Sequence, residues 1–213
     1  MAVVSAARCG GRAPLLGLRA APRAALARRG CSARHCIDVE RDDSIRLRRA
    51  TIADAEPLAR GVIEGVEDYP SFAPPGWTGP SFEAELEHSR DALADPDVYC
   101  LVAESEGALV GQITILPAAR AAHPVEDSSL AHVSNLFVRR DHWGVRLATT
   151  LHRAAVEAAG ERGFTEFRLF VAAGQARARR FYEREGWRPA GDSFDDPIWG
   201  LTFIEYRYRP RDH

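Results

Sequence analysis

Lysine is absent from this sequence, and all 28 of its basic residues are arginine. The chain of 213 residues also has one methionine, four cysteines and no apolar run close to the roughly 18 residues that cross a bilayer. The missing apolar run predicts a soluble protein with no membrane partner. A hydrophobic share of 46% is enough to bury the core of one globular domain. The missing lysine excludes nothing structural, because a GC-rich genome that favours arginine codons accounts for it.

Acidic residues are absent from positions 1–37, which hold seven of the arginines. The rest of the chain carries 21 arginines against 30 acidic residues, so this part is acidic although the whole chain has a net charge of only −2. An acidic domain argues against nucleic acid as the main partner and suits a cationic substrate. We predict that residues 1–42 are a disordered Arg/Ala-rich tail and that residues 43–210 form the single domain. We favour a disordered tail, or a start assigned too early with translation beginning near Val39, over an organelle-targeting segment.

Cysteine and histidine give no sign of a metal site. Cys31, His35 and Cys36 match no zinc spacing, and no second pair completes four ligands. Cys100 lies in an expected strand and is interpreted as a small buried hydrophobe. We therefore predict no metal and no oxidising compartment, and we expect a cytoplasmic protein. The sequence leaves a homodimer open.

Hydrophobic periodicity predicts an alternation of strands and helices. Seven strands are expected, at residues 45–48, 98–103, 108–116, 131–138, 166–171, 188–194 and 201–208. Four helices are expected: one from about residue 55 behind a Thr51–Asp54 cap, and others at 82–93, 145–159 with Gly160 as its stop, and 175–185. Residues 104–107 are expected to make a hairpin turn, and the four prolines of residues 68–80 indicate a loop. This order predicts an α+β fold.

Residues 138–148 are the most informative segment, because an apolar strand there turns abruptly into a helix through a polar segment that contains Gly144. The start of a helix presents unpaired backbone N–H groups and a partial positive charge. Together these bind phosphate or pyrophosphate. A turn with one glycine is common, so this segment alone does not identify the ligand.

A second motif lies further along the chain, where residues 175–183 read QARARRFYE and are followed by Gly186-Trp187. Together the two segments resemble the GNAT superfamily of N-acetyltransferases, which bind acetyl-CoA. In that family the first motif reads Arg/Gln-x-x-Gly-x-Gly/Ala. The second reads Asn-x-x-Ala-x-x-Phe-Tyr, followed by Gly-Phe or Gly-Trp. The resemblance extends from about Ile45 to Tyr208.

The resemblance implies a GNAT-type mixed, largely antiparallel sheet of six to seven strands flanked by about four helices. The sheet would be splayed between the fourth and fifth strands, residues 131–138 and 166–171, with the pantetheine arm of acetyl-CoA in the splay. Unpaired backbone groups there can bind the amides of the cofactor. The residues that the resemblance assigns to the cofactor are Leu136, Phe137, Val138, Trp143, Gly144, Val145, Arg146, Leu147, Ala148, Gln175, Ala178 and Phe181.

Three positions depart from the family pattern. Trp143 stands where Arg or Gln is usual, Arg146 replaces the central Gly, and Gln175 replaces Asn. If residue 146 is already helical, its guanidinium can bind a phosphate. If the position needs a positive φ, arginine there costs about 1 kcal/mol or more and weakens cofactor binding.

The implied reaction moves an acetyl group from a thioester to an amine. The resemblance makes Tyr182 the acid that protonates the departing thiolate, because a phenol and a thiol have pKa values close enough for this transfer. The alternative is that Phe181 and Tyr182 are core residues. The register of Gln175, Ala178 and Gly186 with the family motif favours the catalytic role.

The proton acceptor is expected on the strand at residues 131–138. With a period of two, His132, Ser134, Leu136 and Val138 would share one face. His132 titrates in the range that suits proton transfer at neutral pH, and Ser134 is expected to order a relay water. His132 would lie roughly 20 Å from Val138 along the strand, so it would act at the acceptor end or through water. A hydrogen-bonded, inactive histidine is the equal alternative.

The acceptor pocket is expected between the proline-rich loop and the last two strands. Its main candidate residues are Tyr69, Trp77, Glu67 and Trp199. The further candidates for its walls are Glu64, Asp68, Phe72, Asp195 and Asp196. These assignments predict an acetyl-CoA-dependent N-acetyltransferase that acts on a small-molecule amine. A protein N-terminal or lysine acetyltransferase and a non-catalytic CoA-binding module remain as alternatives.

Overall fold

The computed structural model of the chain describes residues 2–4 and 45–210. Most of the expected tail, residues 1–42, therefore lies outside the described residues, and its predicted disorder and origin stay predictions. The exception is Ala2–Val4, whose backbone forms the short strand β1.

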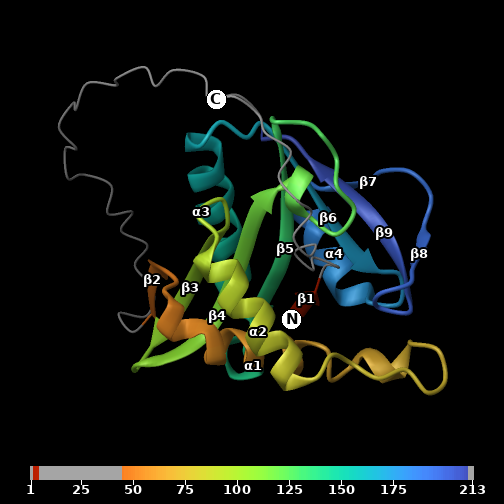
Figure 1. Ribbon diagram of the computed structural model, residues 1–213, viewed down its shortest axis with the longest axis horizontal. Helices are drawn as coiled ribbons and strands as arrows, with labels where there is room; N and C mark the ends of the chain where they lie inside the picture. Colours follow the sequence, from red (N-terminus) through yellow and green to blue (C-terminus); the bar gives the residue numbers. More distant parts are fainter. Residues whose placement is uncertain (1, 5–44, 211–213) are drawn as a thin grey trace, which may run out of the picture.

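A single sheet runs through the domain in the order β2-β3-β4-β5-β6-β9-β7, with β1 paired to β5 and β8 paired to β9 (Figure 1). The strands beyond β1 are β2 (Ile45–Arg49), β3 (Tyr99–Ser105), β4 (Ala108–Pro117), β5 (Leu130–Val138), β6 (Glu166–Ala172), β7 (Arg188–Pro189), β8 (Phe194–Asp196) and β9 (Leu201–Tyr208). Every pairing is antiparallel except that of β5 with β6. This confirms the α+β, largely antiparallel fold.

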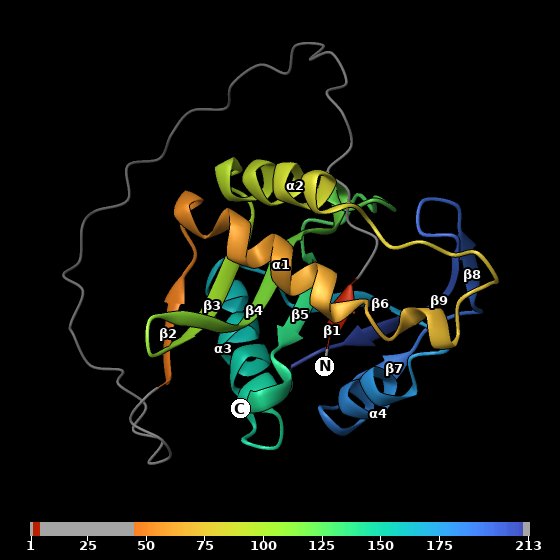
Figure 2. The same cartoon turned by 90° about the horizontal axis from the view of Figure 1, so that it is seen from below.

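Two pairs of helices cover the two faces of the sheet. Helices α1 (Ala55–Gly65) and α2 (Phe82–Ala94) lie on one face, and α3 (Leu147–Glu161) and α4 (Ala176–Arg184) lie on the other (Figure 2). Short 3-10 turns named η1 (Ile52–Asp54), η2 (Tyr69–Ser71), η3 (Ala118–Arg120) and η4 (Arg140–His142) lie between the elements. The four expected helices are thus confirmed.

Three expected boundaries were wrong. The hairpin turn is only Glu106-Gly107, with φ of 51° and 79°, because a two-residue turn of this hand matches the twist of its strands. Helix α3 continues through Gly160 and ends at Glu161, and Gly163, two residues further on, has the left-handed φ of 98° that is common just after a helix. The strand expected at 188–194 is two short pieces, β7 and β8, on either side of a loop.

The sheet opens between β5 and β6. Their parallel pairing covers only Leu130–His132 against Glu166–Arg168, and the strands then part. This confirms the expected splay between the fourth and fifth strands of the domain. Beyond the split, β1 runs antiparallel to β5 and pairs with Asn135 to Phe137.

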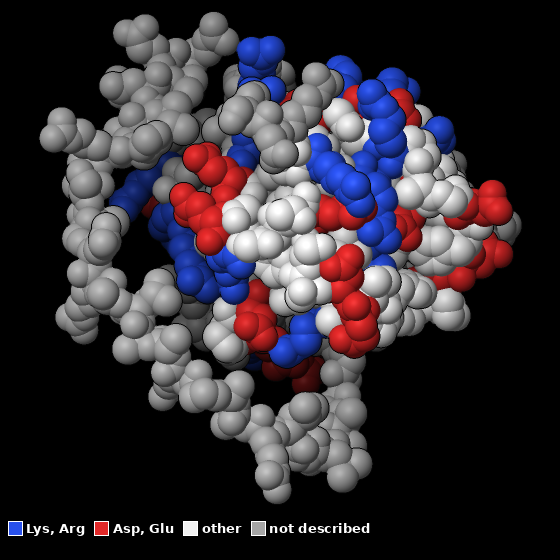
Figure 3. All heavy atoms as spheres, turned by 90° about the horizontal axis from the view of Figure 1, so that it is seen from above, with Lys and Arg blue, Asp and Glu red and all other residues white. Residues whose placement is uncertain are grey.

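Two main clusters of buried side chains form the core. The larger lies under α3 and α4 and includes Leu136, Leu151 and Tyr182, whereas the smaller lies on the α1 side and includes Tyr69 and Phe170. Among the described residues, no helix is both long and apolar enough to cross a membrane. On the face seen in Figure 3, arginine and acidic side chains alternate in small groups.

Candidate functional site

The segment between β5 and α3 has two residues in the left-handed region. Gly144 has a φ of 90°, and Arg146, the residue that caps α3, has a φ of 64° and a ψ of 11°. The helix therefore begins at Leu147 and not at Val145, and the Val145 side chain is 56% exposed. Arg146 therefore has the strained conformation with a positive φ and is not part of the helix.

Two arginine side chains lie over the ring of Trp143, which stands where the family pattern has Arg or Gln. Its indole Nε1 donates to the Val138 carbonyl at 2.7 Å, which closes the turn. The Arg177 guanidinium carbon lies 3.5 Å from the centroid of the Trp143 ring system, and that of Arg140 lies 5.6 Å from it. Cations stack favourably on an indole face. The tryptophan thus holds two guanidinium groups beside the turn.

Arginines line the cavity between this turn and α4, which we call the arginine cavity. It has a volume of about 440 Å³. Its lining includes Gly144 and the first turn of α3, together with Arg146, Arg177, Arg180 and Arg184. Helix N-termini and arginines both bind phosphate oxygens. This arrangement can hold a ligand with more than one phosphate group.

Tyr182, in the second motif, is fully buried. Its ring packs against Phe181 and Trp187, with centroids 5.1 Å and 5.5 Å away. Its hydroxyl oxygen has no hydrogen-bond partner among the described residues. Burial, and then the phenol of Tyr69, raise the Tyr182 pKa, so this hydroxyl keeps its proton throughout the neutral range. In this state it is a weaker acid than the free phenol on which the sequence-based expectation relied. A buried hydroxyl without a partner is costly in a native protein, which suggests that a ligand satisfies it.

The start of α4 connects the two halves of the splay. Gln175 caps the helix, and its Oε1 accepts a long hydrogen bond of 3.4 Å from the Tyr69 hydroxyl. Ala178 and Phe181 are buried in the core under the sheet, one and two turns further on. The two motifs found in the sequence therefore meet around β5.

The expected common face of β5 was wrong because the strand contains a β-bulge. The register shifts at Ser134, since Thr114 pairs with Asn135 and Ile115 pairs with Val133. An extra residue in one strand reverses the alternation of side chains beyond it. His132 therefore contacts Phe170 on the α1 side, whereas Leu136 lies in the cluster under α3.

His132 is fully buried and lines none of the four cavities described in this section. Burial, followed by the nearby charge of Arg168, holds the His132 pKa well below its usual range. The ring is therefore neutral at physiological pH. It is available to accept a proton but binds one weakly. Ser134, at the bulge, is also buried.

The four expected acceptor residues have different surroundings. Tyr69 is a core residue, and only its hydroxyl extends toward Gln175. The Trp77 indole donates to the Trp199 carbonyl at 2.6 Å, which joins the proline-rich loop to the β8–β9 turn. Glu67 is exposed and lies 3.8 Å from the Arg140 guanidinium. The two loops thus meet as expected, but Glu67 lies apart on the surface.

Two cavities lie beside the proline-rich loop, and their linings include Phe72 and Asp195, which the sequence placed at the expected acceptor pocket. One has a volume of about 210 Å³ and is lined by Phe137, Trp143 and Gln175, so we call it the Gln175 cavity. The other, of about 640 Å³, is lined by Pro74, Leu201 and the exposed Asp195, and we call it the Asp195 cavity.

The buried carboxylate of Asp196 fixes the β8–β9 turn. Asp196 accepts from the backbone N–H groups of Ile198 and Trp199 and lies 2.7 Å from His123 Nε2. His123 comes from the loop after β4, and its ring packs edge-on against Phe194. Asp196 is therefore used in holding the loop. Sequence analysis missed this pair because its members lie far apart in the chain.

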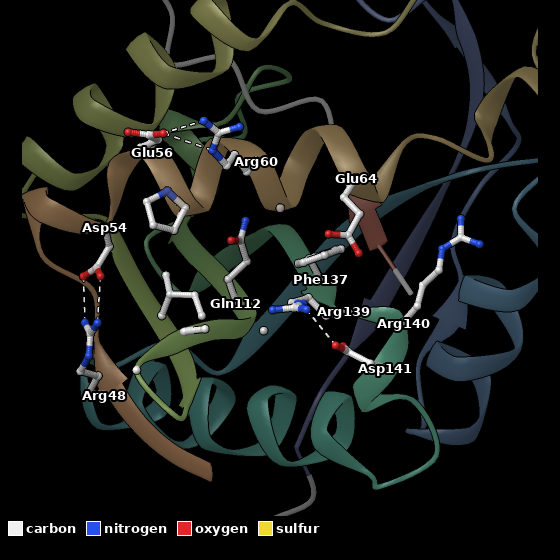
Figure 4. Close-up of a pocket in the computed structure, with 16 residues that line it drawn as sticks. Arg48, Asp54, Glu56, Arg60, Glu64, Gln112, Phe137, Arg139, Arg140 and Asp141 are labelled. Atoms are coloured by element: carbon white, nitrogen blue, oxygen red, sulfur yellow. Dashed lines mark hydrogen bonds and ion pairs between the residues drawn. The ribbon is translucent and has the colours of Figure 1, made fainter. Parts of the chain in front are cut away.

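A further cavity, of about 720 Å³, lies between α1 and the ends of β4 and β5 (Figure 4). Most of its charges are neutralised in pairs, namely Arg48–Asp54, Arg60–Glu56 and Arg139–Asp141. Figure 4 shows the carboxylate of Glu64 directed toward Phe137, where this cavity approaches the Gln175 cavity. Among the described residues, no group of three or more potential metal ligands comes together.

Comparison with known proteins assigns the chain to a protein family. The model of the acetyltransferase (GNAT) family matches residues 64–187, a span that contains both motifs and Tyr182. The chain belongs to the GNAT family and is an N-acetyltransferase, an acyl-transferring enzyme.

Individual relatives extend this result. A Bacillus subtilis (strain 168) protein with the provisional name ribosomal protein bS18-alanine N-acetyltransferase is 31% identical over 121 residues, which cover 57% of this chain and 70% of that protein. The PaiA N-acetyltransferase of Thermoplasma acidophilum, solved with coenzyme A, has a TM-score of 0.60 at 19% identity over 78% of this chain and 99% of that chain. The aminoglycoside acetyltransferase AAC(6')-Ib, solved with coenzyme A and kanamycin, has a TM-score of 0.57 at 21% identity over 78% of this chain and 95% of that chain. The last two likenesses concern the fold.

Proposed function

We propose that the chain transfers the acetyl group of acetyl-CoA to a primary amine of a small cationic molecule. The observation that carries this proposal is the hydroxyl of Tyr182, which is buried, protonated and without a hydrogen-bond partner among the described residues. Tyr182 lies in the same core cluster as Leu136 and Val138 of β5, where β5 has parted from β6, although it lines none of the four cavities described above. The thioester sulfur would have to end beside this hydroxyl. Acetyl-CoA supplies an activated acyl group and a thiolate leaving group.

The turn and α4 would hold the phosphates of the donor. The N–H groups of Leu147 and Ala148 lie at the start of α3, and Arg146, Arg177 and Arg180 line the same cavity. Each charge-assisted hydrogen bond to a phosphate contributes more than a neutral one. The guanidinium of Arg146 would offset the strain of its own backbone.

The edge of β5 beyond His132 would bind the pantetheine arm, at Leu136 to Val138. Here β6 no longer pairs with β5, so the backbone groups on that edge need other partners. Strand β1 pairs with Asn135 to Phe137 on β5. Donor binding at this edge would therefore compete with β1.

The acceptor must lose a proton before it attacks. An alkylamine with a pKa of about 10.4 is only about one part in a thousand neutral at pH 7. His132 would take the proton through water ordered by Ser134, since its ring is buried and neutral. The amine nitrogen then forms its bond to the acetyl carbon as the carbon–sulfur bond breaks, and Tyr182 gives its proton to the departing thiolate. The second proton that the nitrogen loses on becoming an amide returns through water to Tyr182, and His132 releases the first proton to solvent.

The size and charge of the Asp195 cavity favour a small cationic amine. A volume of about 640 Å³ suits a small molecule, and the Asp195 carboxylate lies at its exposed side. One structural neighbour binds kanamycin, an observation in the same direction. The second candidate acceptor is the N-terminal amine of a protein, favoured by the 31% identical relative.

One assay separates these acceptors. Purified protein is incubated with acetyl-CoA and either a panel of small mono- and diamines or peptides that begin with alanine, and released CoA is measured with a thiol reagent. We expect CoA release to depend on the small amines. Release with peptides alone would favour the second candidate, and release with neither would overturn the proposed function.

A further inference from the structure

Phe72 and Gly174 make an unusually close contact between distant segments. Phe72 follows η2 in the proline-rich loop, and Gly174 lies between β6 and α4. A Cβ atom built on Gly174 would lie 2.5 Å from Cβ and Cδ2 of Phe72, and closer still to its Cγ. Real Cβ atoms essentially never approach other atoms so closely. Any larger residue at position 174 would therefore have to displace the phenyl ring.

The backbone does not require glycine at this position. Unlike Gly144, Gly174 has a φ outside the left-handed range, so another residue could adopt its conformation. The space taken by Phe72 is thus the physical reason for a glycine here.

The contact lies at the boundary between the two cavities of the site. Phe72 and Gly174 line both the Gln175 cavity and the Asp195 cavity, and no other residue of the described part of the chain lines both. The Gln175 cavity has Trp143 and Arg177 at its other end, beside the proposed phosphate site. The Asp195 cavity opens between the two loops. The ring of Phe72 therefore stands between the proposed donor and the proposed acceptor.

Phe72 is held on one side by the core. Its ring centroid lies 4.9 Å from that of Tyr69, and its backbone N–H donates to the Tyr69 carbonyl at 3.0 Å. Tyr69 is fully buried and also contacts Trp77, with centroids 5.7 Å apart. The phenyl ring itself is only half-buried. The backbone of Phe72 is thus fixed by Tyr69, while part of its ring is exposed to the two cavities.

We propose that Phe72, seated on Gly174, is the partition that decides which amines reach the acetyl group, and that the Asp195 cavity takes the acceptor. This inference rests on the proposed function. The lining gives the acceptor class: Ala73, Pro74 and Leu201 contact an apolar body, and Asp195 meets a cation. The acceptor is a small diamine with an apolar spacer, one amino group directed past Phe72 and the other held by Asp195.

Asp195 is suited to this second contact because its carboxylate is exposed and already oriented. The Thr202 hydroxyl donates to its Oδ1 at 2.6 Å. Asp196, in contrast, is buried and occupied by the loop backbone and His123. Asp195→Asn keeps the hydrogen bond from Thr202 but removes the charge. It should reduce the preference for a diamine over the monoamine of equal length by roughly tenfold.

The test of the partition is a double-mutant cycle at positions 72 and 174. Steady-state kcat/KM is measured for amines of increasing bulk, with the dissociation constant of CoA measured in parallel. Phe72→Ala and the milder Phe72→Leu should raise the kcat/KM ratio of bulky to small amines at least tenfold, with CoA affinity within about twofold of wild type. Gly174→Ala should lower kcat/KM for every amine, because its methyl group displaces the ring. Adding Phe72→Ala to Gly174→Ala should restore most of that loss.

Phe82→Ala is the matched control, because Phe82 is a half-buried phenylalanine at the start of α2 that lines neither cavity. The partition is overturned if Phe72→Ala has the same amine profile as Phe82→Ala, or if the loss in Gly174→Ala persists in the double variant. If the wild-type protein acetylates no amine at all, the proposed function fails instead. Melting temperatures of all variants identify any that are not folded.

Discussion

The two halves of the site are built in different ways. The proposed donor half, residues 138–148 and 175–186, consists of two continuous motifs whose backbone conformation does most of the positioning. The proposed acceptor half, residues 64–77, 172–174 and 194–203, is assembled from separate loops that are held by side-chain contacts. These contacts include the Trp77 indole on the Trp199 carbonyl and Phe72 on Gly174.

This difference predicts a division of effects. Changes in the donor half should alter CoA affinity or the chemical step for every acceptor alike. Changes in the acceptor half should instead alter the preference among amines and leave CoA affinity near its wild-type value. A change in the acceptor half that alters CoA affinity, or a change in the donor half that alters amine preference, would show that the two halves are coupled.

The largest effect is expected for Tyr182→Phe. The substitution keeps the buried ring but removes the only acidic proton, so turnover should fall by roughly 10²- to 10⁴-fold. CoA affinity and melting temperature should stay close to wild type. The measurement is kcat with one amine from pH 6 to 9, beside CoA titration. Normal turnover across this range would make Tyr182 a core residue only.

The pH dependence of stability tests the packing beneath the donor half. His152 of α3 accepts a hydrogen bond from the Trp187 indole at 2.9 Å, and burial lowers its pKa to about 4. Between pH 6.5 and 4 the unfolded histidine gains a proton that the folded one does not, so stability falls as the pH falls. The loss attributable to His152 is at most about 3 kcal/mol, and it levels off below its folded pKa.

His152→Gln keeps an acceptor for the Trp187 indole but cannot titrate. Urea denaturation at pH 7 and at pH 4 should show a smaller acid loss in this variant than in wild type. Part of the loss should remain, because His132 is also buried with a lowered pKa. An identical acid loss in the two proteins would rule out His152 as its source.

Gly144→Pro should weaken CoA binding by roughly 10- to 100-fold, as expected for the loss of hydrogen bonds to a charged group. Proline fixes φ near −65°, which is incompatible with the φ of 90° at this position. Gly163→Pro is the control, because Gly163 has a φ of 98° at the other end of the same helix. Calorimetric titration with CoA gives both affinities. Equal weakening in the two variants would point to a damaged helix rather than to a phosphate site.

Two variants of Arg146 separate the effect of its backbone strain from the effect of its guanidinium charge. Arg146→Gly should raise the unfolding free energy by about 1 kcal/mol, because glycine relieves a φ of 64°. Its CoA affinity should remain similar. Arg146→Ala keeps the strain and also lacks the guanidinium, so it should gain no stability. If both variants abolish CoA binding, the guanidinium is the main anchor and the backbone turn is secondary.

The smallest effect is expected when residues 1–38 are removed, so that the chain begins at Val39. This change deletes β1, which pairs with Asn135 to Phe137 on the edge proposed for pantetheine. Melting temperature should change little. CoA affinity should stay the same or rise by no more than about twofold, which is close to the precision of the titration. A drop of several degrees on truncation would show that the domain needs this segment.

The same division explains what the sequence could predict. The turn after β5 and the helix α4 could be predicted because each belongs to a continuous motif with a recognisable spacing. The roles of these motifs and of Tyr182 in binding and catalysis stay predictions. The positive φ of Arg146 could not be decided, since side-chain type alone allows a strained conformation when the surrounding structure enforces it.

Non-local geometry accounts for the errors and omissions. The bulge at Ser134 depends on how β4 pairs with β5, so a strict period of two placed His132 and Leu136 on one face. The contact of Phe72 with Gly174, and that of His123 with Asp196, join residues that no local pattern connects. A glycine between a strand and a helix also has a common local explanation. This concealed its role against Phe72.

The proposed acetyl transfer from acetyl-CoA to a small amine is tested most sharply with an isotopically labelled acetyl group. The wild-type chain is incubated with acetyl-CoA labelled in the acetyl group and with a small diamine, and mass spectrometry follows the label. Acetyl transfer to the amine should give labelled amine in an amount equal to the CoA thiol released. Thiol released without labelled amine, or no release with any amine, would contradict it.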